Sequence, residues 1–398
     1  MKRVLFVQST LEPHGGGYAV AAWMLDTLKR EYDITLLTWR PPDFDAINGQ
    51  FGTSLVSSDV RILCPKLPAR WLIQAIPDQW NIQKFSYLLR IAKRLAASHD
   101  VAMTAEMEAD FGRPGIQYVH FPYLGTSFQR LTHSLEMPLP GKAAGLASGR
   151  IRPWMLWSNY SFDRMRRNLT LVNSDWTGDC YRAAFGGETI TLYPPAAGEF
   201  PRTPFEAREN GFACVGRFHP AKRADWVIEM LARVHEVFPE VRLHLVGRTG
   251  SFPGERAFYP QLAALVRSHS SWVRLHEGIS RRELAGLLST LRYGIHALVD
   301  EHFGMGIAEM LRAGCVPFVH ESGGQVEIVG NDPALLYSSA DDAVERILRV
   351  LRNPGLQSEL ASKLQQRAER FTVEAFAAGL REAVRGFLSR PQVELYYP

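Results

Sequence analysis

The chain has 398 residues, with 45 Lys and Arg, 41 Asp and Glu, a formal net charge of +4 and 46% hydrophobic residues. These values are typical of a globular protein of two or three domains, and they exclude a disordered, collagenous or coiled-coil chain. Residues 1–198 carry 21 basic and 17 acidic side chains and so hold the whole positive excess. An excess this small does not indicate a nucleic-acid binder, but it suits an anionic ligand or a membrane surface.

The cysteines and the amino terminus indicate the compartment. Four cysteines lie far apart without a CxxC pair, which argues against a disulfide scaffold or a zinc ribbon and favours a reducing cytoplasm. The apolar run that begins the chain ends at Gln8, too early for the core of a signal peptide, so it predicts a buried strand. No run approaches the ~18 apolar residues of a membrane helix. We therefore expect a cytoplasmic protein.

The first half of the chain alternates strands and helices. Val4–Val7 is a continuous apolar strand, Tyr18–Arg30 has helical apolar spacing, and Ile34–Thr38 is the next strand. Strand, glycine-rich loop, helix and strand in this order predict a βαβ unit with a parallel sheet. Further strands are expected at residues 101–104, 117–120 and 169–173.

The same alternation restarts after a linker rich in Pro and Glu that runs from Tyr193 to Asn210. Phe212–Val215 is expected to be a strand and Arg223–Phe238 a long amphipathic helix. Further strands are expected at residues 242–246, 272–275, 295–299, 315–320 and 334–337, and helices at residues 282–291, 307–313, 340–351 and, as one long helical region, 356–388.

These patterns predict two Rossmann-like, doubly wound parallel-sheet domains that face each other across a cleft. The first domain would span residues 1–198 and the second residues 199–375, while a last helix within residues 376–398 would return to the first domain. Phe376, Leu380, Val384 and Leu388 recur at helical spacing and need an apolar partner. Ligands of open α/β sheets bind at the carboxyl ends of the strands, so a ligand site is expected there.

Two segments are candidates for binding an anionic ligand. Gly15, Gly16 and Gly17 follow the first strand, where glycines allow close approach to a ligand at the start of a helix; a flexible turn is the alternative. In the segment that begins at Gly216, after the strand Phe212–Val215, the two cations are Arg217 and Lys222. Both suit a diphosphate, unless the segment is an ordinary solvated loop.

A third segment places two carboxylates eight residues apart. Glu301 is expected at the end of a strand and Glu309 on the following helix, near the same wall of the cleft. A carboxylate can accept hydrogen bonds from both hydroxyls of a sugar diol, and the main-chain amides at the helix start suit a negative group. The alternative makes Glu301 a helix cap and Glu309 a surface residue. The residues between them that would contribute are Phe303, Gly304, Met305, Gly306 and Ile307.

Three weaker features complete the pattern. Ser322–Gln325 contains a glycine pair that either approaches a ligand or turns the chain, and His120, at the end of a strand, is either a ligand contact or an ordinary buried histidine. Arg150–Thr170 interleaves five Arg with two Trp, which fits a membrane-surface element or an interface helix. The twelve histidines show no metal-binding spacing, so no metal site is expected.

Taken together, GGG, GRFHPAK, EHFGMGIAE, RAGCVPF and SGGQVEIV resemble, in this order, the retaining glycosyltransferases of family four with the GT-B fold. A narrower likeness links YVHFP, LVNSDWT, LYPPA and HESGG to the eukaryotic α-1,2-mannosyltransferases that extend the lipid-linked oligosaccharide core from GDP-mannose. This sequence departs from them by lacking an N-terminal membrane segment and by having Gln325 where they usually have Pro. These departures suggest a prokaryotic relative.

The resemblance implies a role for each motif residue. Arg217 and Lys222 would hold the donor diphosphate, Glu309 the ribose, and Glu301 the donor sugar hydroxyls. His120 would lie near the reacting sugar. Gly16 and Gly17 would lie near the phosphates or the acceptor, and Gly216 with the 303–307 loop would complete the donor site.

The implied reaction transfers a hexose, which the narrower likeness identifies as mannose from GDP-mannose, to a glycan or lipid-linked acceptor with retention of configuration. No metal and no cofactor would take part, because the leaving β-phosphate oxygen would accept the proton of the acceptor hydroxyl. The protein would act in the cytoplasm or on the inner face of the membrane. Two alternatives are an inactive GT-B-like subunit that only binds nucleotide sugars and a nucleotide-sugar epimerase, which needs catalytic carboxylates in the first domain that the sequence does not show.

Overall fold

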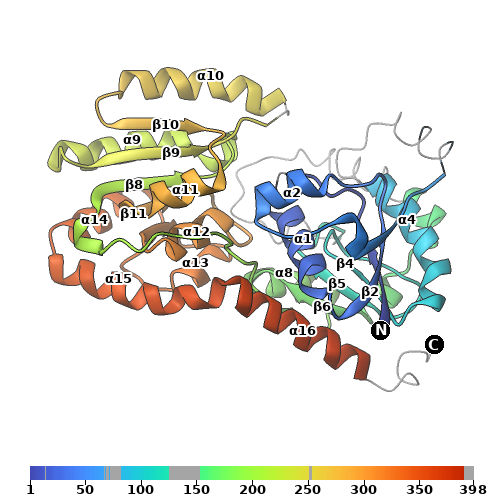
Figure 1. Ribbon diagram of the computed structural model, residues 1–398. Helices are drawn as coiled ribbons and strands as arrows, with labels where there is room; N and C mark the ends of the chain where they lie inside the picture. Colours follow the sequence, from blue (N-terminus) through green and yellow to red (C-terminus); the bar gives the residue numbers. More distant parts are fainter. Residues whose placement is uncertain are drawn as a thin grey trace. The chain divides into compact units, whose positions relative to one another are not determined.

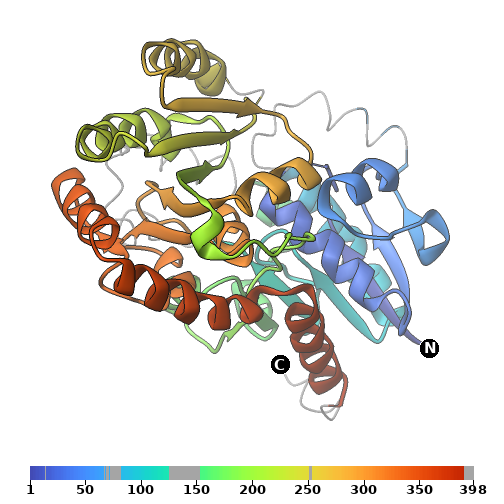
Figure 2. The same cartoon turned by 60° about the vertical axis from the view of Figure 1, so that its left-hand side comes forward.

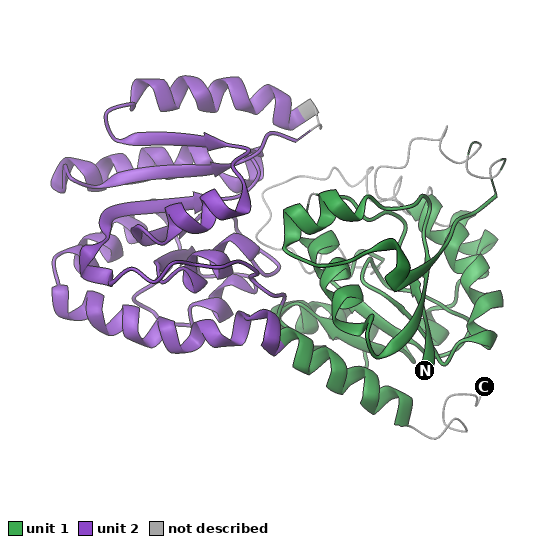
Figure 3. Cartoon of the chain, viewed as in Figure 1, with its two compact units in different colours: residues 1–193, 376–398 green, residues 194–375 purple. Residues whose placement is uncertain are grey.

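The computed structural model describes residues 1–13, 15–66, 68, 71, 82–124, 153–250 and 253–389. The chain divides into two compact units, as Figure 3 shows: unit 1 comprises residues 1–193 and 376–398, and unit 2 comprises residues 194–375. Within the described residues, no helix combines the length and the apolar character needed to cross a bilayer.

Unit 1 is built on a parallel sheet. In its described part, seven strands lie in the order β3-β2-β1-β4-β5-β6-β7, and each paired strand runs parallel to its neighbour. Strand β1 pairs with β2 on one side and β4 on the other, so the direction of winding reverses at β1. The strands are β1 (Lys2–Val7), β2 (Tyr32–Leu37), β3 (Val60–Leu63), β4 (Val101–Thr104), β5 (Ile116–Val119), β6 (Leu169–Val172) and β7 (Ile190–Thr191).

The central strands of unit 1 are mostly apolar and buried, as expected for a parallel sheet that helices cover (Figure 1). Val4–Val7 of β1 are fully buried, and one core cluster joins Leu5 and Val7 to Phe85 and Leu88. The helices are α1 (Gly16–Leu28), α2 (Phe44–Phe51), α4 (Ile82–Leu95), α7 (Phe162–Met165), α8 (Asp175–Phe185) and, from the chain's end, α16 (Val373–Ser389), with 3-10 turns η1 (Ser57–Asp59) and η2 (Ala96–Ser98).

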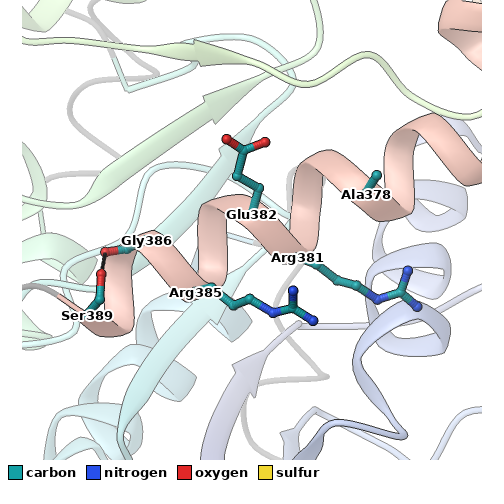
Figure 4. A pocket seen from close by; sticks show the side chains of 6 residues that line it. All are labelled: Ala378, Arg381, Glu382, Arg385, Gly386 and Ser389. Carbon is teal, nitrogen blue, oxygen red and sulfur yellow. Dashed lines mark hydrogen bonds between the residues drawn. The ribbon is translucent and has the colours of Figure 1, made fainter.

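The part of helix α16 from Phe376 onward belongs to unit 1. Arg381 and Arg385 extend from the same side of the helix in Figure 4, and both form ion pairs with Glu31, at 2.6 and 2.9 Å. Lys2 donates a hydrogen bond from Nζ to the main-chain oxygen of Leu388. The expected helix reaches residue 398, and residues 390–398 lie outside the described residues. A surface hollow runs along this helix, lined by Ala378, Arg381, Glu382, Arg385, Gly386 and Ser389.

Unit 2 repeats the architecture. Six strands of its described part lie in the order β10-β9-β8-β11-β12-β13, all paired in parallel, and Figure 2 shows the strands stepping down from β10 near the top of the view. Strand β8 pairs with β9 on one side and with β11 on the other, so the winding reverses at β8. The strands are β8 (Glu209–Val215), β9 (Arg242–Gly247), β10 (Val273–Glu277), β11 (Leu291–His296), β12 (Val316–His320) and β13 (Leu336–Tyr337).

The helices of unit 2 alternate with these strands. They are α9 (Ala224–Val237), α10 (Pro253–Ser268), α11 (Arg281–Leu288), α12 (Met305–Arg312), α13 (Gln325–Ile328), α14 (Ala340–Leu351) and α15 (Pro354–Ala368), with 3-10 turns η3 (Phe205–Ala207), η4 (Pro220–Lys222) and η5 (Glu369–Phe371).

Two expectations from the sequence were wrong in detail. Residues 356–388 are not one helix: α15 ends at Ala368, and Thr372 starts α16 by accepting the N–H of Ala375 on its hydroxyl oxygen. The strand expected at residues 295–299 is β11, which already ends at His296, so Glu301 lies in the loop after the strand rather than at its end. Periodicity failed here because β11 contains Arg292 and Gly294 within its buried run.

Candidate functional site

The candidate donor site lies at the carboxyl ends of the strands of unit 2, around the point where the winding reverses. The loop Gly216–Lys222 follows β8, and the loop that carries Glu301 follows its neighbour β11. Crevices at such reversal points are where open α/β sheets bind ligands. Two segments separated by about eighty residues of sequence therefore meet because their strands are adjacent.

The loop Gly216–Lys222 is fixed by main-chain contacts with β9 and the residues after it. The N–H groups of Gly216 and Phe218 donate to the oxygens of Val246 and Arg248, at 2.9 and 3.0 Å. Gly247 is required here, since a Cβ at that position would lie 1.9 Å from the oxygen of Gly216. These contacts hold the loop at the end of the sheet, so that Lys222 is directed by a rigid scaffold.

Lys222 forms an ion pair with Glu301, whose side chain is only 14% exposed. The Nε2 atom of His296 lies 2.9 Å from the same carboxylate oxygen, Oε2. Burial acts to raise the pKa of Glu301, but the positive charge of Lys222 and the hydrogen bond from His296 outweigh it and hold this pKa well below its usual range. Glu301 is therefore a carboxylate kept ionised inside the protein.

The Ser-Gly-Gly loop after β12 supports the backbone of Glu301. The N–H of Gly324 donates to the oxygen of Glu301 at 2.8 Å, and the hydroxyl of Ser322 accepts the N–H of Asp300 at 2.8 Å. Gly323 has a φ of +74°, and a Cβ there would lie 2.4 Å from the oxygen of Glu301. The glycine pair thus both turns the chain and allows close approach, and what it approaches is the main chain beside the predicted sugar-binding carboxylate.

The segment Phe303–Ile307 sets the start of α12 against the end of β8. Gly304 has a φ of +105° and accepts the N–H groups of Ile307 and Ala308 on its oxygen, at 2.9 and 3.1 Å. A Cβ on Gly306 would lie 2.8 Å from the oxygen of Val215, so only glycine allows this contact. Phe303 is buried against Phe371, and Met305 is the first residue of the helix. The positive end of α12 therefore lies beside the loop that begins at Gly216.

Glu309 is buried on α12 and forms an ion pair with Arg281, Nη2 to Oε1, at 3.1 Å. Burial raises the pKa of Glu309, and Arg281 opposes that rise. Arg281 also donates to the main-chain oxygen of Ala197, so it connects the start of unit 2 to Glu309. Reading the sequence missed Arg281. Its signal was the capping pair Ser280 and Glu283, which places residue 281 at the first position of α11.

Arg217 is directed toward α10 rather than toward Glu301. Its Nη1 lies 3.1 Å from Oε1 of Glu255, a side chain with no exposed surface, while the Arg217 side chain itself is 60% exposed. Glu255 could not be singled out from the sequence, because it lies in the first turn of α10 and is not part of a motif at the end of a strand. The expectation that Arg217 and Lys222 face one ligand stays a prediction, since each cation has its own carboxylate partner.

The motif residues of unit 1 form a separate group within that unit. Gly15 has a φ of +113°, and Gly16 and Gly17 begin α1. A Cβ on Gly17 would lie 3.3 Å from Nε2 of His120, which itself lies 3.0 Å from the oxygen of Ala105. The ends of β1, β4 and β5 therefore bring the glycines and His120 together. Among the described residues, no group of three or more His, Cys, Asp and Glu side chains is arranged to hold a metal ion.

Comparison with solved structures defines the class of the fold. Sucrose-phosphate synthase from Thermosynechococcus elongatus is similar over 98% of this chain and all of its own, with a TM-score of 0.69 at 16% identity. Anabaena HepE, solved in complex with UDP, covers 97% of this chain and all of its own, with a TM-score of 0.65 at 17% identity. Two parallel α/β units with these neighbours confirm the GT-B fold class that the sequence predicted.

A family model matches the second unit. Residues 198–371 match the model of the family described as glycosyl transferases group 1. The predicted resemblance to glycosyltransferases of this type is thereby confirmed.

Relatives with known names agree with the family. An enzyme of Dictyostelium discoideum named GDP-Man:Man(3)GlcNAc(2)-PP-Dol alpha-1,2-mannosyltransferase is 28% identical over 233 residues, 52% of this chain and 45% of the relative. The human protein of the same name is 28% identical over 203 residues, 46% of this chain and 41% of the relative. The chain thus spans about half the length of the curated relatives that it matches.

Proposed function

We propose that this protein is a retaining glycosyltransferase that transfers mannose from GDP-mannose to a hydroxyl group of a glycan or lipid-linked acceptor. The observation that carries the proposal is the Lys222–Glu301 pair beside the start of α12, within a glycosyl transferases group 1 domain. The names of the relatives support GDP-mannose as donor and a lipid-linked oligosaccharide as acceptor. The Anabaena neighbour was solved with UDP, so a donor that carries uracil in place of guanine is the competing candidate.

In the proposed reaction, positive charge stabilises the departing nucleoside diphosphate. Lys222 has three N–H donors and uses one on Glu301, so it can also bind a phosphate oxygen, and the helix start at Met305 adds a partial positive charge. Arg217 would contribute by exchanging Glu255 for phosphate. Stabilising the charge that develops on the leaving group is commonly the largest contribution to catalysis.

Carboxylates would hold the sugars. Both described contacts of Glu301 fall on Oε2, which leaves Oε1 available to accept a hydroxyl of the donor hexose, and Oε2 of Glu309 is similarly available for the ribose. The leaving β-phosphate oxygen would take the proton of the acceptor hydroxyl on the same face of the sugar, which gives retention without a metal ion. His120, Gly16 and Gly17 of unit 1 would contact the reacting sugar and the acceptor.

We propose further that unit 1 binds a membrane surface peripherally. Leu156 and Trp157 are 73% and 38% exposed, and the guanidinium of Arg90 stacks on the Trp157 ring at 4.7 Å. Trp157 also stacks on Tyr87, so this part of the segment is both an interface and an exposed surface. Apolar side chains flanked by arginines bind anionic lipid surfaces. Residues 150–152 of the segment that the sequence singled out lie outside the described residues.

A panel of nucleotide sugars tests the donor. GDP-mannose at 100 times its dissociation constant should stabilise the folded protein by about 2.7 kcal/mol. UDP-glucose at the same concentration should stabilise it less, because it should bind more weakly. Transfer to a lipid-linked acceptor should then yield a product whose anomeric configuration, read by NMR, matches the donor, with activity unchanged by a chelator. If the protein binds the nucleotide sugar but transfers no sugar, the inactive subunit is favoured. If it changes the sugar of the nucleotide sugar when no acceptor is present, the epimerase is favoured.

A further inference from the structure

His296, which none of the sequence motifs singled out, ends strand β11 with a side chain that is only 4% exposed. Its Nε2 lies 2.9 Å from Oε2 of Glu301. Its main-chain oxygen accepts the hydroxyl of Tyr337 at 2.6 Å, and Tyr337 is in turn buried under the ring of Trp226. The hydrogen bond from Tyr337 therefore fixes the main chain of His296, and the imidazole ring forms a hydrogen bond with Glu301.

The protonation of this histidine follows from its partner. Burial lowers the pKa of His296, and the nearby charge of Lys222 lowers it further, while the hydrogen bond to Glu301 and the charge of Glu301 raise it. The net shift is downward from an ordinary value already below 7, so the neutral ring predominates near neutral pH. An ionised carboxylate only accepts hydrogen bonds. The ring must therefore carry its proton on Nε2 and donate it to Glu301, which selects one tautomer.

Lys222 and His296 bind the same oxygen of Glu301, and this leaves the carboxylate with one occupied and one available oxygen. When the ammonium group of Lys222 turns toward a diphosphate, its hold on Glu301 weakens. His296 is neutral and has no comparable attraction to phosphate, so its hydrogen bond persists. It can keep Oε1 aimed in one direction while the cation moves.

We propose that His296 is a positioning residue: through its hydrogen bond to Oε2 it fixes the orientation of Glu301 while Lys222 engages the leaving diphosphate. This inference rests on the proposed function for its consequence in catalysis, but its effect on Glu301 does not. The residue does not touch the reacting atoms and acts through Glu301.

Two substitutions separate the hydrogen bond from the volume of the ring. His296→Gln places an amide N–H near the position of Nε2, whereas His296→Leu fills a similar space without a donor. We expect His296→Leu to lower kcat by on the order of 10- to 100-fold, the range for losing a hydrogen bond to a charged group, with a smaller change in KM. His296→Gln should recover most of that loss.

The pH profile gives a readout that a merely structural role would not move. Removing a donor to the carboxylate raises the pKa of Glu301, so the acidic limb of kcat/KM should shift to higher pH in His296→Leu and stay near the wild-type position in His296→Gln. As a matched control, His235→Leu removes a histidine near the end of α9, which stacks on Trp272 at the amino ends of the strands. It should leave both kcat and the acidic limb unchanged.

Carbon NMR of the Glu301 carboxyl group distinguishes failure of this inference from failure of the proposed function, because it needs no activity. In folded His296→Leu, the pKa of Glu301 should lie above that of wild type and of His296→Gln. An unchanged pKa, or an active enzyme in which Leu and Gln have equal kcat, would overturn the positioning role. If wild type transfers no sugar yet the pKa shifts as expected, the proposed function fails while the assignment of His296 to Glu301 stands.

Discussion

Glu301 of unit 2, whose side chain is 14% exposed, and Glu108 of unit 1, which is fully buried, both lie in a loop after a parallel strand, yet their pKa values shift in opposite directions. Lys222 and His296 keep the pKa of Glu301 well below its usual range despite burial. Glu108 has no exposed surface, and burial raises its pKa to about 8, with the main-chain N–H groups of Glu108 and Leu124 offsetting only part of the rise. Among the described residues, no side chain or main-chain group forms a well-aligned hydrogen bond to either carboxyl oxygen of Glu108. Burial alone therefore does not decide charge; the partner does.

A third carboxylate shows that unit 1 also builds charged sites. Asp110, two residues from Glu108, is buried, but Lys93 and Arg164 bind it at 2.8 Å each. Burial acts to raise the pKa of Asp110, and the hydrogen bonds from Arg164 and Lys93 bring it below its usual value. The pKa values of two carboxyl groups only two residues apart are thus shifted in opposite directions.

The largest expected effect on kcat comes from removing the cation beside Glu301, which leaves this carboxyl without an ion-pair partner among the described residues, as Glu108 is. Lys222→Ala removes the cation from Glu301 and from the proposed diphosphate site, so kcat should fall by roughly 10²–10³-fold, as for a lost donor to developing negative charge. Arg217→Ala should lower kcat in the same sense. Steady-state kinetics measure both, and the pKa of Glu301 should rise in Lys222→Ala. An exposed cation of the same unit, Arg233, serves as control; Lys222→Ala with wild-type kcat would refute the assignment.

The second prediction concerns the pH dependence of stability. The folded pKa of Glu108 is about 8, above its ordinary 4.5, so the folded state holds the proton more tightly. Its contribution to stability is complete below about pH 4.5 and is lost as the pH rises toward 8, by on the order of 1 kcal/mol per pH unit. Glu108→Gln should remove this loss and be more stable than wild type at pH 8, as measured by denaturant unfolding at several pH values. Equal pH slopes in the two proteins would show that Glu108 is ionised.

Glu309 should affect binding rather than the chemical step. The ribose that it would hold does not change charge during transfer, so Glu309→Ala should raise KM by about tenfold with little change in kcat. Arg281→Ala should also raise KM, because it removes the cation that holds the Glu309 carboxylate at 3.1 Å and opposes the rise of its pKa. A fall in kcat at unchanged KM would place Glu309 with the leaving group instead.

The smallest expected effect tests the surface of unit 1. Vesicles containing anionic lipid should bind the protein at low salt and release it as salt rises, because exposed charges are screened over ~10 Å at 0.1 M. Leu156→Ser together with Trp157→Ser should weaken this binding without changing the activity on a soluble acceptor. Vesicles of neutral lipid are the control. If wild type sediments with neither kind of vesicle, the segment is an interface within unit 1 only.

Much of the fold could be predicted because its signals are local. The apolar run at Val4–Val7 and the helical spacing at Arg223–Phe238 follow from neighbouring residues alone, and both elements are present in the structure. Short or partly polar elements such as β3 (Val60–Leu63) and β7 (Ile190–Thr191) escaped, since they take their stability from the adjacent strand.

The sequence by itself determined the class of fold and the residues that carry the motifs, among them Lys222, Glu301 and Glu309. The structure then showed that Gly304, Gly306 and Gly323 are needed for a positive φ or a close approach. Only the tertiary structure decided which charges meet. Lys222 contacts Glu301, which also binds His296, because β11 pairs with β8 where the winding reverses. Glu309 contacts Arg281 because α12 and α11 lie close together. Strand order is set by packing of whole elements over long range, and a buried carboxyl takes its charge from the partners which that order supplies.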